Sequence, residues 1–386
     1  MSATTVRAGQ KNKNKLKVNA DYDYKLIACV ILLAGFGLVV LYSSSYYSQG
    51  ISMLIKQAIF TVAGLALMII FTELDYHIFR PIAMPMFLLS LAVTMLVIVP
   101  GLGVEVNGAK RWIDLKITTF QPAEFVKLAM ILALAGILSV YHKKLKKLSV
   151  IILLFLVVIV PVGITFLITE NLSSAMILFV MGYGMIYLAY PDKRLLLVIA
   201  GLLILAAIGM IYYIVEIKEY VPGESFRYTR IRLWFDPFNE KYPNSYQVRQ
   251  GLYGIATGGL FGRGLGNSIL KQGFLPEPYN DMIFSVLCEE MGLFGAGMVL
   301  FLFFYLISRI FRIALSAPDR FGFYICSGVM LHVASQVVLN VMVVTNTIMN
   351  TGITLCFFSG GGSSLIFIYI EMGLVLSVAR RIQNPR

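Results

Sequence analysis

Long apolar runs separated by short polar stretches organise the chain from residue 25 onward. A helix needs about 20 apolar residues to cross the hydrocarbon core of a bilayer. Runs of that length predict about ten membrane-spanning helices, and hence an all-α integral membrane protein. The expected spans are 25–43, 53–72, 81–100, 122–140, 148–168, 174–190, 195–215, 282–308, 321–344 and 353–378.

Two polar segments lie outside this pattern. Residues 1–24 are polar and basic and lack the apolar centre of a signal peptide, so we expect a disordered cytoplasmic tail. Residues 216–281 form one long loop between the seventh and eighth expected helices. Because no repeat is visible in the rest, we expect a single polytopic membrane domain over residues 25–380.

Composition supports the membrane assignment and excludes other classes. Of the 386 residues, 58% are hydrophobic and 13% are charged, with a mean hydropathy of +0.80. Soluble domains carry about a quarter charged residues, which excludes a soluble enzyme or a DNA-binding protein. The net charge of +12 therefore indicates membrane orientation, not a nucleic-acid partner. Lysines and arginines cluster in short loops on the side of the N-terminus, which predicts cytoplasmic termini and an extracellular long loop.

Cysteines, histidines and glycines give no sign of a metal or nucleotide site. The four cysteines lie in apolar stretches without metal-binding spacing, and the three histidines are far apart in sequence. We therefore expect no metal cluster. The GRGLGN sequence at 262–267 lacks the preceding strand of a dinucleotide-binding unit, which excludes NAD.

Ionisable residues within apolar spans are costly, and they are candidates for functional sites. Glu124 and Lys127 share a helix face, so they either form an ion pair that locks two helices or line a polar cavity. Asp281 lies at the mouth of the eighth span, where a carboxylate either caps the helix or acts chemically. Glu289 follows about 12 Å deeper along that helix. Two carboxylates in such different surroundings suit acid–base chemistry.

Basic residues beside aromatic ones mark the polar loops. Lys110, Arg111 and Trp112 precede the fourth span, where Trp112 either anchors the chain at the interface or belongs to a binding patch. Arg111 has the geometry to hold a phosphate. Three further arginines alternate with aromatic residues in the long loop: Arg227, Arg230 and Arg232. This pattern is typical of an interfacial segment that contacts lipid-linked phosphates.

Small and polar residues flank the start of the last expected span, at 340–352 and 357–364. Small residues allow close packing of helices. They also occur where a broken helix lines a cavity within the membrane. The sequence leaves both interpretations open.

Six motifs, in order along the chain, resemble the SEDS family (shape, elongation, division and sporulation). They are GAKRWI (108–113), FQPAEFVKL (120–128), RIRLWFDP (230–237), YQVRQGLYGIATGGLFGRGLGNS (246–268), LPEPYNDMIFSVLCEEMGLFG (275–295) and FFSGGGSS (357–364). The compact GGLFGRGLGNS spacing is more similar to the FtsW-like division and sporulation branch than to the RodA-like branch. Asn171, Asn350 and Gly360 are the three departures from the family pattern that call for an explanation, and Ala123 is a further one.

The resemblance implies a ten-helix peptidoglycan glycosyltransferase in the bacterial cytoplasmic (inner) membrane, which polymerises lipid II on the outer face. It also implies a class B penicillin-binding protein, a single-span transpeptidase, and other divisome proteins as partners. The family's essential aspartate falls on Asp281, its buried glutamate on Glu289, its loop tryptophan on Trp112, and its polar pair on Glu124 and Lys127.

These assignments imply that Asp281 removes a proton from the acceptor sugar, while basic side chains stabilise the leaving diphosphate. A divalent cation, Mg²⁺ or Mn²⁺, is the one cofactor that such chemistry could use. Two alternatives remain. A lipid II flippase would use Glu124, Lys127, Glu289 and His332 as a polar pathway, and a non-catalytic scaffold would only recruit the transpeptidase.

Overall fold

The computed structural model describes residues 22–106, 109–114, 116, 119–218, 220–221, 226–242 and 245–383. Within these residues, ten helical segments are long and apolar enough to cross a membrane. The prediction of an all-α membrane protein with ten spans is therefore confirmed. Most of the expected tail, residues 1–21, lies outside the described residues.

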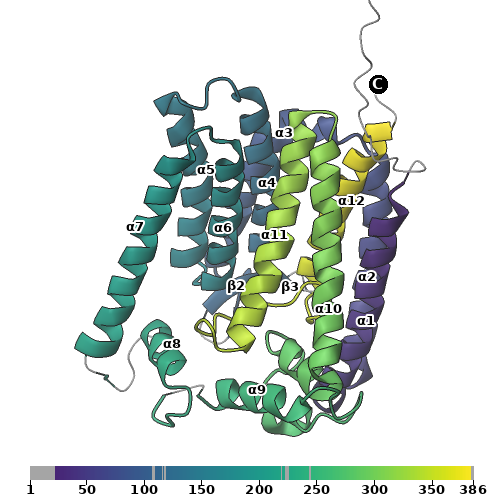
Figure 1. Cartoon of the computed structure of the whole chain (residues 1–386), viewed down its shortest axis with the longest axis vertical. Coiled ribbons are helices and arrows are strands. Elements are labelled where there is room, and N and C mark those ends of the chain that lie inside the picture. Colours follow the sequence, from purple (N-terminus) through teal and green to yellow (C-terminus); the bar gives the residue numbers. More distant parts are fainter. Residues whose placement is uncertain are drawn as a thin grey trace, which may run out of the picture.

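The spans form one bundle (Figure 1). They are α1 (Tyr24–Gln49), α2 (Ile51–Glu73), the Tyr76–Ile98 segment around α3 (Phe79–Met95), α4 (Pro122–Val140), α5 (Leu148–Leu167), α6 (Leu172–Ala189), the Lys193–Ile217 segment around α7 (Lys193–Tyr212), α10 (Ile283–Ser316), α11 (Arg320–Val344) and α12 (Gly362–Gln383). Helix α4 is the most buried span, and α7 stands apart at the edge with almost all of its surface exposed.

The two described chain ends meet at one end of the bundle. The Asp23 carboxylate accepts a hydrogen bond from Arg309 near the end of α10, with a separation of 2.8 Å. The Tyr22 hydroxyl donates to Glu73, whose carboxylate also pairs with Arg380 of α12. Both ends of the chain are therefore fixed at the same level of the bundle, far from the helices α8 and α9 (Figure 1).

The opposite end of the bundle carries a small sheet and two short helices in addition to the predicted membrane-spanning helices. Strands β1 (Gly103–Val106), β2 (Ala109–Asp114) and β3 (Thr119–Phe120) form an antiparallel sheet in that order. Helices α8 (Phe226–Phe235) and α9 (Ser245–Gly258) lie within the expected long loop (Figure 1). This end of the molecule therefore holds most of the polar candidates from the sequence.

Residues 345–361, between α11 and α12, are a non-helical segment that is largely buried. The last span accordingly begins at Gly362 and not at residue 353 as expected. Gly37 of α1 lies so close to it that a Cβ there would be 2.3 Å from the Phe357 carbonyl oxygen. Of the two interpretations of these small residues, the structure favours the broken helix, and close packing accompanies it.

Side chains from neighbouring helices satisfy the backbone of this segment. Gln57 of α2 donates to the Ser359 carbonyl oxygen at 3.1 Å, and Asn340 of α11 donates to Ile353 at 2.6 Å. Gln336 donates to the Thr354 carbonyl oxygen at 3.1 Å. Irregular backbone at membrane depth is tolerated only where protein groups satisfy it, which explains these buried amides on apolar helices.

Helix α10 is interrupted at Gly292, where φ is +65° and ψ is −170°. The preceding loop, residues 259–265, docks against the interruption through backbone hydrogen bonds. The amides of Arg263 and Gly264 donate to the carbonyls of Glu289 and Glu290, each at 2.9 Å. In the other direction, the amides of Leu293 and Phe294 donate to Gly259 and Leu260, at 2.9 and 3.0 Å. The loop thus replaces the hydrogen bonds that the helix loses.

We expect Gly292→Ala to destabilise the protein by about 1–3 kcal/mol, because it combines a strained φ with a clash. A Cβ at this position would lie 2.4 Å from the backbone nitrogen of Gly262. Gly297, one turn further along α10, has nothing within 4 Å of such a Cβ. Gly297→Ala should therefore leave the unfolding temperature in detergent unchanged. Equal unfolding temperatures for the two variants would contradict the docked-loop geometry.

Candidate functional site

Asp281 lies immediately before α10, at the end of the molecule that carries α8 and α9. Gln247 of α9 donates to its carboxylate at 3.5 Å, and Asn340 of α11 donates to its backbone oxygen at 3.0 Å. The 345–361 segment passes beside it, so that a Cβ at Gly352 would be 3.7 Å from Asp281 Oδ2. Three separate parts of the chain thus fix this one carboxylate.

The surroundings of Asp281 disfavour its charged form. Burial raises the pKa of Asp281 to about 6, and the negative charge of Glu277 adds to the increase. The positive charge of Arg230 opposes it. A carboxyl group with a pKa near 6 can take up a proton and release it at neutral pH, which is the property of a general base or acid.

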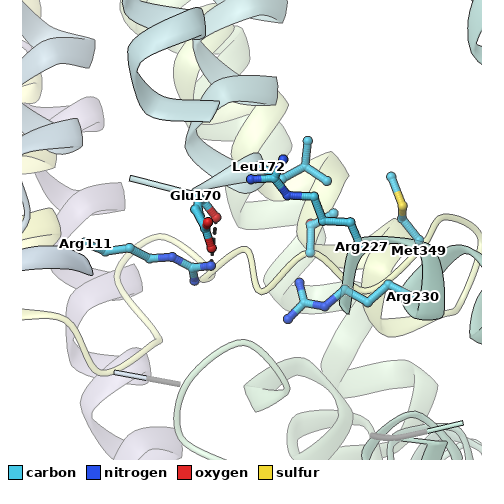
Figure 2. Close-up of a pocket in the computed structure, with 7 residues that line it drawn as sticks. Arg111, Glu170, Leu172, Arg227, Arg230 and Met349 are labelled. Carbon is cyan, nitrogen blue, oxygen red and sulfur yellow. Dashed lines mark hydrogen bonds between the residues drawn. The ribbon is translucent and has the colours of Figure 1, made fainter. Parts of the chain in front are cut away.

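A pocket beside this carboxylate gathers three arginines. Arg111 comes from β2, while Arg227 and Arg230 come from α8, and Figure 2 shows Arg111 and Arg230 approaching from opposite sides. The complete lining is Arg111, Glu170, Leu172, Arg227, Arg230, Met349 and Thr351. The pocket therefore combines one acidic residue with three basic ones, which suits an anion.

An irregularity in β2 explains why Arg111 reaches the pocket. The pairing with β1 passes from Trp112 opposite Val104 directly to Lys110 opposite Glu105, so Arg111 is the extra residue of a β-bulge. Such a bulge turns a side chain out of the regular alternation of the strand. The Arg111 Nη2 donates to the Glu170 carbonyl oxygen at 2.9 Å (Figure 2). Lys110 is exposed and Trp112 is half-buried. Neither lines the pocket formed by the described residues.

These positive charges are buried and close together, which favours the binding of a negatively charged ligand. Burial lowers the pKa of the Arg111 guanidinium from its usual value, and the charge of Arg230 lowers it further. Burial also lowers the pKa of Arg230. Within the described part of the chain, the buried Arg111 Nε and Thr351 Oγ1 have no hydrogen-bond partner. An anion between them would supply acceptors and offset the repulsion.

Two residues connect the pocket with the carboxylate. Arg230 lines the pocket and also acts electrostatically on Asp281. Thr351 lines the pocket, and the next residue, Gly352, adjoins the Asp281 carboxylate. The Asp281 carboxylate and the arginine pocket therefore form one continuous site.

The third arginine of the long loop, Arg232, lies elsewhere. It is buried, and its guanidinium donates to the Lys218 carbonyl oxygen beside the Tyr220 ring. Arg227 donates to the Phe166 carbonyl oxygen at 3.1 Å and lies over the Phe166 ring. The structure thus brings together Arg111, Arg227 and Arg230 and leaves Arg232 outside this pocket.

Glu124 and Lys127 form an ion pair in the first turns of α4. Their side chains are 2.8 Å apart and almost completely buried. Another buried pair joins α11 to α12, where His332 Nδ1 and the Glu371 carboxylate are 2.8 Å apart. Glu124 and Lys127 therefore form a buried ion pair, but the pair lies within α4 and does not join two helices as expected. Neither residue lines the arginine pocket formed by the described residues.

Glu289 is buried and holds the chain that follows the docked loop. Its carboxylate accepts hydrogen bonds from the Ser268 hydroxyl and from the backbone amides of Ile269 and Leu270, the latter at 3.0 and 3.3 Å. Arg263 lies 3.2 Å from the same carboxylate. These contacts show Glu289 binding the protein's own backbone.

Its neighbour Glu290 forms a second buried pair that sequence reasoning missed. Lys271 Nζ lies 2.8 Å from the Glu290 carboxylate, and the Ser43 hydroxyl of α1 donates to that carboxylate at 2.6 Å. Little in the sequence indicates this pair, because Lys271 and Glu290 are 19 residues apart. The pocket residue Thr351 carried no signal either, since a lone threonine in a small-residue stretch has many uses.

The three departures from the family pattern have local explanations. Asn171 caps α6 by accepting from the Ser174 amide at 3.0 Å, which an aspartate would also do. The Asn350 side chain accepts from the Gly352 amide at 3.0 Å, beside Asp281. At Gly360, a Cβ would lie 2.0 Å from the Met53 side chain, so Met53 takes the space that a larger residue would need.

A divalent cation does not match the donors present. The described residues contain no group of three histidine, cysteine, aspartate or glutamate side chains placed to hold one. The pocket beside Asp281 presents three guanidinium groups, which repel a cation. We therefore assign no step to a metal ion.

Comparison with known proteins identifies the family. A sequence model described as "Cell cycle protein", for FtsW, RodA and SpoVE, matches residues 24–384. The chain belongs to this family. The resemblance expected from the six motifs is thereby confirmed over almost the whole sequence.

Relatives within the family are similar along nearly their full length. The chain is 32% identical to a probable peptidoglycan glycosyltransferase FtsW of Trichlorobacter lovleyi, over 93% of each chain. It is also 32% identical to the stage V sporulation protein E of Bacillus subtilis, covering 93% of this chain and 97% of that protein. These names agree with the expected division and sporulation branch.

Solved structures of the family share the fold. A chain from a peptidoglycan synthase complex that coordinates polymerization and crosslinking superimposes with a TM-score of 0.77 and 28% identity, covering 94% of this chain and 98% of that one. The rod shape determining protein RodA of Thermus thermophilus gives a TM-score of 0.68 and 28% identity, covering 96% and 99%. This family member is therefore a multi-pass membrane protein with a known architecture.

The raised pKa of Asp281 predicts a stability effect with a defined sign. The native state holds the proton more tightly than the unfolded chain, so stability falls as the pH rises from 3.8 to about 6. Asp281→Asn cannot ionise, and we expect it to unfold at a higher temperature than the wild type at pH 8. The difference should disappear below pH 4. A variant that is less stable at pH 8 would contradict the burial of this charge.

Proposed function

We propose that this chain is a peptidoglycan glycosyltransferase that polymerises lipid II into glycan strands during cell division or sporulation. The observation that carries the proposal is the pairing of Asp281, with a pKa of about 6, and the adjoining pocket of three arginines. Glycosyl transfer from a lipid diphosphate requires both a base and a site for an anionic leaving group. The printed names of the FtsW relatives agree with this chemistry.

The reaction needs one displacement at the anomeric carbon of the donor sugar. The acceptor hydroxyl oxygen forms a bond to that carbon while the bond to the lipid diphosphate breaks, and the proton moves to the Asp281 carboxylate. Arg111, Arg227 and Arg230 hold the diphosphate as its negative charge grows. Because attack and departure occur in a single step, the configuration of the anomeric carbon is inverted.

The remaining candidates support this centre from a distance. Glu289 acts as a positioning residue, since its carboxylate fixes residues 268–270 and not the reacting sugar. Glu124 and Lys127 stabilise α4 at the level where the Gln121 amide donates to Ser363 of α12. Lys110 and Trp112 contact lipid headgroups outside the pocket, whereas the buried Arg232 holds the segment at Lys218.

The site and the sequence together support a definite orientation and partner. Basic short loops at the end that carries both described chain ends support cytoplasmic termini and an outward α8–α9 end in the bacterial inner membrane. A class B penicillin-binding protein is the proposed partner, with other divisome proteins, because one similar chain belongs to a peptidoglycan synthase complex. Its transpeptidase would crosslink the strands produced at Asp281.

Replacing the proton acceptor is the first test. We expect Asp281→Asn, purified with its partner and supplied with lipid II, to lose polymerisation by about 10²- to 10⁴-fold. In the wild type, the rate should rise with pH through about 6, since the carboxylate must be ionised. The control is Glu277→Gln, an exposed carboxylate whose charge raises the pKa of Asp281.

This control has its own signature. Glu277→Gln should keep the maximal rate and move the acidic limb of the pH profile to lower pH, because one cause of the raised pKa is removed. Polymerisation at the wild-type rate by a folded Asp281→Asn would overturn the proposal.

The arginine pocket predicts a separate loss of substrate affinity. Arg111→Gln removes a charged donor from the pocket, and we expect KM for lipid II to rise about 10- to 100-fold. Lys116→Gln removes the same charge from an exposed position between β2 and β3 and should leave KM unchanged. Equal increases for both variants would indicate a general charge effect and would contradict a specific anion pocket.

The two alternatives make different predictions. A flippase would move labelled lipid II across proteoliposomes without forming polymer, and a scaffold would support growth with both Asp281 and Glu289 replaced. The Glu124–Lys127 and His332–Glu371 pairs, each with a contact of 2.8 Å, are the described groups that a polar pathway would use. Among the described residues, Glu124 Oε2 and His332 Nε2 are buried without a hydrogen-bond partner. The two measurements therefore distinguish these alternatives from polymerisation.

A further inference from the structure

The docked loop 259–265 exposes apolar side chains beside those of a membrane-spanning helix. Leu260 and Phe261 are exposed, and Phe261 has 80% of its surface accessible. The backbone hydrogen bonds described above place them next to Leu293 and Phe294 of α10, which are also exposed. Four large apolar side chains therefore form one patch, which we name the loop–α10 patch.

This patch continues directly into the exposed apolar face of α10. Phe294, Met298, Phe301 and Phe304 follow one another at intervals of three or four residues and are all exposed. That spacing places them along one side of the helix. Since α10 is one of the ten spans, this side belongs to the surface that faces the membrane interior.

The height of the patch along α10 also falls within the hydrocarbon core of the bilayer. Gly292 and Arg309 are 17 residues apart, or about 26 Å along a helix. Arg309 pairs with Asp23 at the end of the bundle where the chain begins, which marks the polar boundary on that side. The hydrocarbon core is about 30 Å thick, so the docked loop falls inside its other boundary.

Much of the loop backbone is hydrogen-bonded within the protein. Its amides and carbonyls exchange four hydrogen bonds with α10, and the Gly262 amide donates to Gly258 at 2.8 Å. Backbone in contact with lipid must be satisfied in this way. The charged side chain of the loop, Arg263, pairs with the buried Glu289 carboxylate at 3.2 Å, which compensates its charge. Exposed apolar side chains and an internally bonded backbone point to the same surroundings.

We propose that loop 259–265 enters the acyl-chain region of the leaflet at the α9 end, with Leu260 and Phe261 in contact with lipid. The occupant of the loop–α10 patch is the bilayer itself. The loop would then anchor the start of α10 in the leaflet. Because Asp281 lies only two residues before α10, this anchor sets the height of the carboxylate above the hydrocarbon. The proposal concerns membrane position and stands independently of the proposed glycosyl transfer.

Site-directed spin labelling tests the surroundings of the loop. Phe261→Cys and Phe294→Cys would each carry a nitroxide in the full chain, reconstituted in nanodiscs of phosphatidylethanolamine and phosphatidylglycerol. The four native cysteines are buried, so the unmutated chain measures background labelling. Collisions with molecular oxygen report lipid, and collisions with a water-soluble nickel chelate report water.

Two further positions calibrate the measurement. Phe304→Cys lies on the membrane-facing side of α10, and Lys146→Cys lies in the exposed loop between α4 and α5. We expect the oxygen-to-nickel ratio at 261 and 294 to match that at 304. A ratio at 261 matching that at 146 would place the loop in water and overturn the proposal. Low access of both probes would show a covering protein surface and would equally overturn it.

Discussion

The need to satisfy every backbone polar group without water shapes the functional end of this molecule. A continuous helix meets that requirement automatically, but a helix cannot present a carboxylate, an anion pocket and their connecting segment in one place. Within the described residues, the spans give way to non-helical backbone at Gly292 and over residues 345–361. Each departure is compensated, by loop 259–265 in one case and by Gln57, Gln336 and Asn340 in the other.

The electrostatics of the site follow from these compensated interruptions. Asn340 satisfies both the 345–361 segment and the backbone of Asp281, so the same amide that permits the irregular chain also holds the main chain at Asp281. The segment then places Thr351 in the arginine pocket. A carboxylate whose surroundings disfavour its charge thus lies beside guanidinium groups whose surroundings disfavour theirs. Both conditions are relieved when a proton and an anion arrive together.

Much of this arrangement could be predicted from the sequence, because hydrophobicity and isolated charges are local signals. The ten spans could be inferred from residue type and context, and so could the choice of Asp281 and of the three pocket arginines as candidates. The break in α10 could not, since an apolar stretch around Gly292 is typical of an ordinary span. Arg232 was grouped with Arg227 and Arg230 because spacing alone does not reveal which arginine packs against Lys218 and Tyr220.

The contacts at this end of the molecule form at different times during synthesis, because their residues are separated by different lengths of chain. Loop 259–265 and the α10 interruption are about 30 residues apart, so closing that contact costs little entropy and can occur as soon as α10 emerges. The 345–361 segment instead depends on Gln57 and Ser173, which are 302 and 178 residues from their partners. The described contacts of Asp281 with Asn340 and with the segment at Gly352 therefore cannot form until α11 and residues 345–361 have been synthesised. The surroundings of this carboxylate are completed only when nearly the whole chain is present.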